Sequence, residues 1–307
     1  MSLNTKRLLK IGYACCRVIL RHASNKVTKT QIPIDNDQSD MQRDCYAGAR
    51  WRIAMCWNVE ASAAMVVLGV TASVVTYRRG DVPAIWITLG FFTIMEALQF
   101  WGYLVLDQCG TSANRTVTLA SYLHIAVQPF FINAFAIELV PSPLKRRIRQ
   151  WVYGACAVST AVMLIQILPL QSLGQCLPGS ALCAEEWCTV AGNWHIAWNV
   201  PYNGLLVPIE RLFGVHTGFP TYMLSVFVLP LMYGAWRFVI AHLLAGPILA
   251  NALTTNPNEM PAIWCLFSII ILLIGLSPAI RKKVSAQTWW GWPIADNIRT
   301  TAGKTRL

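Results

Sequence analysis

Charged residues are scarce in this sequence. Only 13% of its 307 residues are Asp, Glu, Lys or Arg, whereas soluble proteins carry about 25%. Hydrophobic residues make up 55% of the chain, and each charge placed in hydrocarbon is energetically costly. The scarcity of charge excludes an ordinary soluble domain. It predicts an all-α protein that crosses a membrane, because backbone groups in lipid must be paired within helices.

Several motifs that carry chemistry are missing as well. The ten cysteines include no CxxC pair, and the five histidines form no HExxH, HxxxH or HxxE motif. Zinc fingers and helical metalloproteases depend on such spacings, so neither class is predicted. The net charge of +11 does not predict nucleic-acid binding, because no nucleic-acid-binding motif accompanies it.

The basic residues lie in the two tails and in short segments beside apolar runs. Residues 1–56 contain ten Lys or Arg and four acids, and the spacing of Lys6, Lys10 and Arg17 predicts an amphipathic basic helix. Such a helix suits either a mitochondrial presequence or a segment that lies on a membrane surface, and the sequence leaves both open. We expect the basic loops and the tails, 1–56 and 281–307, to contact anionic headgroups.

Seven apolar segments of about 20 residues follow, each long enough to cross a bilayer as a helix. The segment 190–210 is the least regular, because it contains Asn193, His195, Asn199 and two prolines. We expect it to be surrounded by other helices or to re-enter the membrane. The segments, which define a seven-helix membrane domain of residues 57–280, lie at 57–77, 83–106, 117–140, 150–170, 190–210, 219–244 and 261–280.

The positive charges support seven crossings. With seven, the basic clusters after the first, third, fifth and seventh segments all fall on one face, which the positive-inside rule makes cytoplasmic. The N-terminus is then outside and the C-terminus cytoplasmic, although the basic segment 1–56 argues against this orientation. The clustered residues are Arg78, Arg79, Lys145, Arg146, Arg147, Arg149, Arg211, Arg281, Lys282 and Lys283.

Four cysteines fall in loops on the outer side of this topology: Cys109, Cys176, Cys183 and Cys188. An oxidising compartment would allow disulfides among them. The sequence does not give the pairing, and free thiols are the alternative. A glycosylation sequon begins at Asn114 on the same side, where its closeness to the membrane predicts that it is not used.

Polar residues within the crossings predict a cavity. Polar groups in membrane helices usually face the bundle interior, and Glu96, Gln99 and Tyr103 are spaced three and four residues apart, so they share one helix face. Because the helices alternate in direction, the ionisable residues, with His242 and Glu259 among them, all fall in the outer half. The predicted cavity residues are Glu60, Glu96, Gln99, His124, Gln128, His195, Asn199, Tyr202 and Arg237, with Trp264 beside them.

Three uses of such a cavity remain open. His124, His195 and Glu96 could hold zinc with an open position for a water of lowered pKa. Glu96 and Arg237 could instead bind a charged substrate or exchange protons, although the sequence shows no internal repeat of the kind that many transporters have. Polar side chains can also simply hold helices together.

Two resemblances are visible in the sequence. The strings Trp194–Pro201 (WHIAWNVP), Ser121–His124 (SYLH) and Ala262–Ser268 (AIWCLFS) resemble an uncharacterised multi-pass membrane family over residues 55–280, which implies no activity. The chain also resembles alkaline ceramidases and related seven-span hydrolases in span number and N-out topology. That likeness implies intramembrane histidine ligands with a nearby serine, here Ser121, His124 and His195. The paired histidines of that family's last span are missing, because the last segment contains no histidine.

The sequence thus predicts a multi-pass membrane protein that binds or transports a small molecule, lipid or ion in a polar cavity centred on Glu96, His124 and His195. The alternatives are a zinc-dependent intramembrane hydrolase acting on a lipid amide or ester, and a non-catalytic assembly protein. We expect the plasma membrane or an endomembrane as its location, with a mitochondrial membrane as the alternative that the basic N-terminus raises.

Overall fold

The computed structural model describes residues 57–214, 216–265, 267–286, 288–289 and 292–293. The basic helix predicted within residues 1–56 and the tail residues 294–307 lie outside the described residues. The described part is mostly helical, as the composition predicts.

Four long helices form the first half of the bundle at the places of the first four predicted segments, although the third and fourth helices begin several residues earlier than predicted. Local signals set where they begin: the Asn58 side chain accepts a hydrogen bond from the Ala61 N–H, and the Thr111 side chain accepts one from the Asn114 N–H. Proline opens another of the four, where its missing N–H costs nothing. The helices are α3 (Val59–Arg78), α4 (Pro83–Leu104), α5 (Ser112–Ile137) and α6 (Ser142–Gln166).

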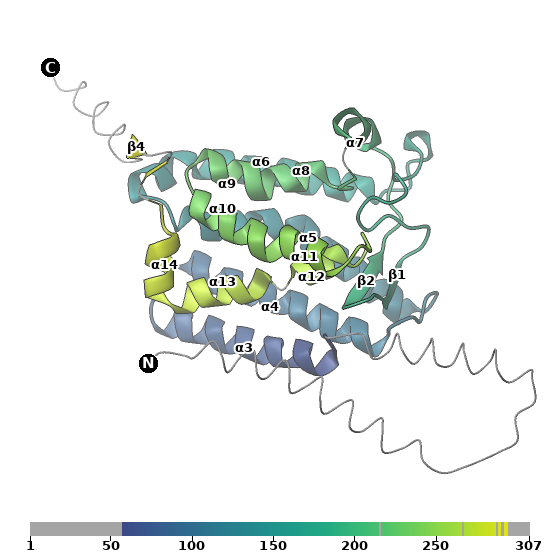
Figure 1. The fold of residues 1–307 in the computed structure, drawn as a ribbon, viewed down its shortest axis with the longest axis horizontal. Coiled ribbons are helices and arrows are strands. Elements are labelled where there is room, and N and C mark those ends of the chain that lie inside the picture. The colour runs from purple at the N-terminus through teal and green to yellow at the C-terminus, as the bar shows by residue number, and fades with distance from the viewer. Residues whose placement is uncertain (1–56, 215, 266, 287, 290–291, 294–307) are drawn as a thin grey trace, which may run out of the picture. The chain divides into compact units, whose positions relative to one another are not determined.

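The second half contains shorter helical segments that join end to end. The predicted crossing at 219–244 is wrong, because the chain reverses between Met232 and Trp236, where Gly234 adopts a φ of +95° that suits only glycine well. Figure 1 shows the two arms side by side. The segments are α8 (Pro220–Met223), π-helix η2 (Leu224–Val228), α9 (Leu229–Met232), α10 (Trp236–Leu243), π-helix η3 (Leu244–Ile248), α11 (Leu249–Leu253), α12 (Met260–Trp264), α13 (Phe267–Leu276) and α14 (Pro278–Val284).

A segment that we name the cap (residues 167–219) connects the two halves in the sequence and lies at one end of the bundle (Figure 1). The predicted crossing at 190–210 is therefore wrong. Its residues form an antiparallel hairpin in which Cys188 pairs with Asn199, followed by a loop and a short helix. The cap elements are the 3₁₀ turn η1 (Gln171–Leu173), β1 (Cys188–Ala191), β2 (Ile196–Asn199) and α7 (Val207–Phe213). Two-residue strands β3 (Thr288–Trp289) and β4 (Trp292–Pro293) follow the bundle.

Two disulfides fasten the cap, and they use all four cysteines predicted to lie on the outer side. Cys109 in the α4–α5 loop is bonded to Cys188 of β1, and Cys176 is bonded to Cys183 within the cap. The sequon residue Asn114 lies underneath, fully buried, and its amide donates to the carbonyls of Val105 and Thr189. This burial explains physically why the sequon should not be glycosylated.

The cap shares the hydrophobic core of the bundle. One continuous cluster of buried apolar side chains includes Phe92 of α4, Tyr122 of α5 and Phe238 of α10 together with Ile196 and Trp198 of β2. The hydrophobic residues of β2, which lies within 190–210, are thus buried against protein. Because this segment does not cross, Arg211 lies at the cap end of the bundle in α7, contrary to the prediction that it joins the other basic clusters.

The opposite end of the bundle carries the other basic clusters. Arg79 donates to the carbonyls of Gly275 and Leu276, where α13 ends, and Arg281 donates to Asp81 over 3.0 Å. Partial burial acts to raise the pKa of the Asp81 carboxyl, but the hydrogen bonds and charges of Arg281 and Arg79 outweigh it and lower that pKa. The two arginines therefore tie the α3–α4 loop to the α13–α14 bend.

Five of the described helices are long and apolar enough to cross a membrane, and six are if the bent pair Met260–Leu276 and Pro278–Val284 counts as one span. The helix Pro220–Met232 is apolar but shorter.

Candidate functional site

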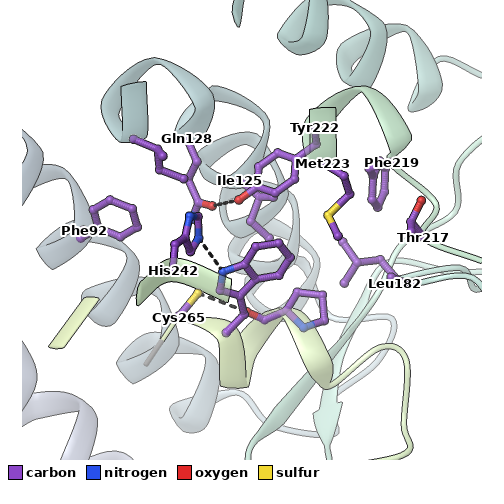
Figure 2. Close-up of a pocket in the computed structure, with 14 residues that line it drawn as sticks. Phe92, Ile125, Gln128, Leu182, Thr217, Phe219, Tyr222, Met223, His242 and Cys265 are labelled. Atoms are coloured by element: carbon purple, nitrogen blue, oxygen red, sulfur yellow. Dashed lines mark hydrogen bonds between the residues drawn. The ribbon is translucent and has the colours of Figure 1, made fainter. Parts of the chain in front are cut away.

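A small cavity of about 60 Å³ lies between the helices directly beneath the cap (Figure 2). It has room for a few water molecules or for part of a small molecule. Its walls come from α4, α5, α8, α10 and α12, and cap residues line the side that faces the cap. The lining residues are Phe92, Ile125, Gln128, Ile132, Ala181, Leu182, Thr217, Phe219, Tyr222, Met223, His242, Pro261, Trp264 and Cys265.

Two hydrogen-bonded pairs supply most of the polarity of this cavity, and both are drawn in Figure 2. The Tyr222 hydroxyl donates to Gln128 Oε1 over 2.6 Å, and the Trp264 indole N–H donates to His242 Nε2 over 2.9 Å. The second bond makes Nε2 the acceptor of the His242 ring, so a neutral ring carries its proton on Nδ1. These two hydrogen bonds fix the rotamers of four side chains that would contact a molecule bound in the cavity.

On the cap side of the cavity, the backbone conformation of the lining residue Leu182 is tightly constrained. Leu182 is almost completely buried and adopts a φ of +65°, which is unusual for a residue with a branched side chain. Val200 N–H donates to the Leu182 carbonyl over 2.8 Å. The Thr217 hydroxyl, also in the lining, has no hydrogen-bond partner among the described residues. The cap therefore contributes both an apolar side chain, Leu182, and a hydroxyl available for hydrogen bonding, that of Thr217, to the cavity lining.

A row of polar residues runs along α4 behind the cavity, as their spacing predicts. The Ser268 hydroxyl donates to Glu96 Oε1 over 2.9 Å, and Tyr103 lies at the outer end of α4 with its hydroxyl 3.3 Å from His195 Nδ1. Glu96 Oε2 and Gln99 Nε2 have no partner in the described part of the chain, and a void of about 10 Å³ beside Glu96 has room for about one water.

Glu259 closes the outer end of this row. Its Oε1 accepts hydrogen bonds from the backbone N–H groups of Trp194 and His195, and its Oε2 accepts one from the Thr254 hydroxyl over 2.6 Å. A Cβ added at Gly192 would lie 2.6 Å from the carboxyl carbon of Glu259, so only glycine fits at that position of the turn. The fully buried carboxylate thus holds the β1–β2 turn against the start of α12.

Of the nine predicted cavity residues, Gln128 lines the cavity, and so do His242 and Trp264, which the sequence analysis placed at the same level and beside that set. His124 stacks on Phe91 at a centroid distance of 3.8 Å, and its Nε2 lies 2.8 Å from the Phe91 carbonyl oxygen. His195, Glu96 and Gln99 belong to the polar row. Glu96, Gln99, His124 and His195 are therefore buried polar residues, as predicted, but they lie behind the cavity and do not line it.

The remaining members of the predicted set lie elsewhere. Glu60 is exposed in the first turn of α3, and Asn199 accepts from Asn258 Nδ2 over 2.8 Å. Tyr202 does not line the cavity itself, but its hydroxyl donates to the carbonyl of the lining residue Ala181 and its ring packs against the lining residue Phe219. Arg237 is exposed at the basic end, because the chain reversal at Gly234 places the start of α10 there.

The described residues contain no group of three or more His, Cys, Asp or Glu that could hold a metal ion. The zinc site predicted from His124, His195 and Glu96 therefore gains no support from the structure. The cavity residues that sequence reasoning missed are mainly apolar, such as Met223 and Phe219, together with Tyr222. Their types are common in any helix, so the sequence carried no signal that could have selected them.

His195 predicts a pH dependence of stability. Burial lowers the pKa of its imidazole to about 3, whereas in an unfolded chain it is near 6.5. Between these values the unfolded state binds more protons, so the free energy of unfolding is fully retained above about pH 6.5 and falls as the pH drops toward about 3.

His195→Gln should reduce the slope of this fall by up to about 1.4 kcal/mol per pH unit, measured by denaturant unfolding from pH 7.5 to 5. The exposed His216→Gln is the control; equal slopes for His195→Gln and the parent chain would contradict the prediction.

Comparison with known proteins gives the chain a family. Neither the search of curated proteins nor the search of solved structures found a match. Residues 60–285 match a family model described as "Family of unknown function (DUF5765)", and these residues cover the helical bundle and the cap. Because this match spans more than half of the 307 residues, the chain belongs to the DUF5765 family.

Proposed function

We propose that this protein crosses a membrane seven times and binds a small, mainly apolar molecule, or the end of a membrane-derived lipid, in the cavity beneath the cap. The five long apolar helices, the bent pair and the helix Pro220–Met232 together supply the seven crossings. Pro220–Met232 rises only about 20 Å. The residues before it, Gly218 and Phe219, are buried within the protein, where irregular backbone is tolerated at membrane depth.

Exposed apolar side chains support the membrane placement. Long helices of the bundle turn large hydrophobic residues outward, for example Val67 on α3, Leu123 on α5 and Val158 on α6, which are 65%, 39% and 63% exposed. Water would disfavour so many exposed apolar side chains, whereas lipid tails solvate them. The surface of the bundle is therefore suited to hydrocarbon.

The two ends of the bundle support an orientation. The end with Arg79, Lys145 and Arg281 is basic, which predicts the cytoplasmic side. The cap end carries both disulfides, which persist in oxidising compartments. The two signals agree, and both support an orientation with the N-terminus of α3 outside, although residues 190–210 form a hairpin in place of the predicted crossing.

The observation that carries the binding proposal is the arrangement of the cavity walls. Apolar side chains surround two fixed polar pairs, Tyr222–Gln128 and Trp264–His242. Ligand pockets have this composition, with apolar walls giving affinity and a few fixed polar groups giving orientation. A molecule with an apolar body and one hydroxyl, carbonyl or amide group would suit such walls.

Filling the cavity tests the proposal. Ile125→Trp adds volume inside the lining, whereas Leu123→Trp on the same helix adds it on the outer surface. Mass spectrometry of small molecules extracted from purified full-length protein should find at least about tenfold less of one bound species in Ile125→Trp, corresponding to about 1.4 kcal/mol of lost binding. Leu123→Trp should retain it. Equal amounts in both variants, with thermal midpoints that match, would contradict the proposal.

A further inference from the structure

A second, larger pocket opens on the outer side of the bundle, between the ends of α5 and α6 and the cap. Its volume is about 380 Å³, enough for a small polar molecule or a headgroup. It shares no lining residue with the cavity beneath the cap. The pocket is lined by Arg115, Ile167, Leu168, Pro169, Leu170, Gln171, Gly174, Gln175, Ala184, Glu185, Trp187, Pro201, Tyr202 and Asn203.

Two opposite charges line this pocket without touching. Arg115 and Glu185 are both exposed, and no ion pair joins them to each other or to another side chain within the described residues. Two such charges kept apart leave space for a ligand that carries a negative and a positive group. Arginine suits phosphate, and a carboxylate suits an ammonium.

The rest of the lining favours the same kind of ligand. The Trp187 ring is half-buried and packs against Tyr122 in a T-shaped arrangement, so an aromatic ring of fixed position lines the pocket, and such a ring can attract a quaternary ammonium. On the other side, Leu168 and Leu170 are 49% and 40% exposed at the end of α6, beside the outward-facing Leu164. Charged groups and apolar side chains therefore meet at the level where headgroups meet acyl chains.

We propose that this pocket binds a zwitterionic group in which a phosphate is joined to an ammonium, with Arg115 holding the phosphate and with Glu185 and Trp187 holding the ammonium. A membrane phospholipid and a free phosphocholine share this chemistry. The site rests on the membrane placement proposed above, but it does not depend on the cavity beneath the cap.

Binding to purified full-length protein in detergent tests the site. The probes are dihexanoyl-phosphatidylcholine, dihexanoyl-phosphatidylglycerol and phosphocholine, with bound copies counted by native mass spectrometry. Arg115→Gln and Glu185→Gln should each weaken phosphatidylcholine binding about tenfold, the change expected for a lost charge-assisted hydrogen bond. Arg211→Gln and Glu186→Gln, exposed cap residues outside the pocket, are the matched controls. Ile125→Trp should leave this binding unchanged, which separates it from the proposed cavity ligand.

Each outcome decides a part of the proposal. Competition by phosphocholine would support the headgroup chemistry with either source, and binding of phosphatidylcholine without such competition would support the membrane lipid. Phosphatidylglycerol binding as tightly as phosphatidylcholine, with Glu185→Gln silent, would overturn the zwitterionic ligand. No binding of any probe, or equal binding by the pocket variants and their controls, would overturn the site.

Discussion

Replacing Glu259 with alanine is expected to lower the free energy of unfolding by about 3 kcal/mol, because two buried donors and one part-buried donor lose their acceptor at about 1 kcal/mol each. The donors are the N–H groups of Trp194 and His195 and the Thr254 hydroxyl. The hydrogen bonds from the His195 N–H and the Thr254 hydroxyl are buried and the one from the Trp194 N–H is part-buried, and Glu259 itself is fully buried where the β1–β2 turn meets α12. The loss should therefore loosen the cap as well as the bundle.

Denaturant unfolding of the detergent-solubilised protein measures this effect. Glu259→Gln should fall between the parent chain and the alanine variant, because its amide keeps one acceptor oxygen while its NH₂ faces donors. Glu186→Ala, an exposed glutamate in the same cap, should change stability by no more than about 0.5 kcal/mol. A Glu259→Ala variant as stable as Glu186→Ala would show that the carboxylate does not hold the turn.

Removing the two disulfides should give unequal losses. Cys109 and Cys188 are 79 residues apart, whereas Cys176 and Cys183 are 7 apart. The chain-entropy relation assigns about 4.5 kcal/mol to the longer loop and about 2.5 kcal/mol to the shorter one. The Cys109→Ala/Cys188→Ala double variant should therefore be about 2 kcal/mol less stable than Cys176→Ala/Cys183→Ala.

The comparison requires non-reducing conditions and identical detergent for both double variants. Cys156→Ala, which removes a buried free thiol, gives the cost of losing sulfur alone. Adding a reductant to the parent chain should reproduce the combined loss. Equal stability of the two double variants would mean that the Cys109–Cys188 bridge does not constrain the unfolded chain as the connectivity implies.

Sequence reasoning located the first four helices because each is both apolar and long. The predicted segments 57–77 and 83–106 correspond to α3 (Val59–Arg78) and α4 (Pro83–Leu104) within a few residues. Hydropathy reports that a segment avoids water, but it cannot say whether lipid or protein replaces the water. The segment 190–210 is apolar because Ile196 and Trp198 are buried in the shared core, and hydropathy therefore misread it as a crossing.

The reversal at Gly234 was missed for a related reason. Both arms of the hairpin are apolar, so the run 219–244 looks continuous in the sequence. The break depends on the positive φ of Gly234, and a glycine in a sequence does not by itself predict a positive φ. In the proposed topology the two errors compensate, because one crossing is lost at the cap and one is gained at the hairpin. The proposed number of crossings and the proposed orientation therefore stay as the positive charges predicted.

The interior polar groups were only partly predictable. Helical spacing correctly placed Glu96, Gln99 and Tyr103 on one buried face of α4, because that spacing depends only on local geometry. The partners of these groups could not be foreseen. Ser268 and His195 meet them through packing of segments far apart in the sequence, and His195 does so from the β1–β2 turn, within a segment that was predicted to be a helix.

The account depends most on a bundle that crosses a membrane with the cap outside. Single cysteines at two exposed positions, Glu186→Cys in the cap and Lys282→Cys in α14, test this directly with a membrane-impermeant maleimide on intact cells. The background variant replaces with serine the cysteines at Cys15, Cys16, Cys45 and Cys56. We predict labelling of Glu186→Cys from outside and labelling of Lys282→Cys only after permeabilisation. Labelling of both positions from the same side would contradict the account.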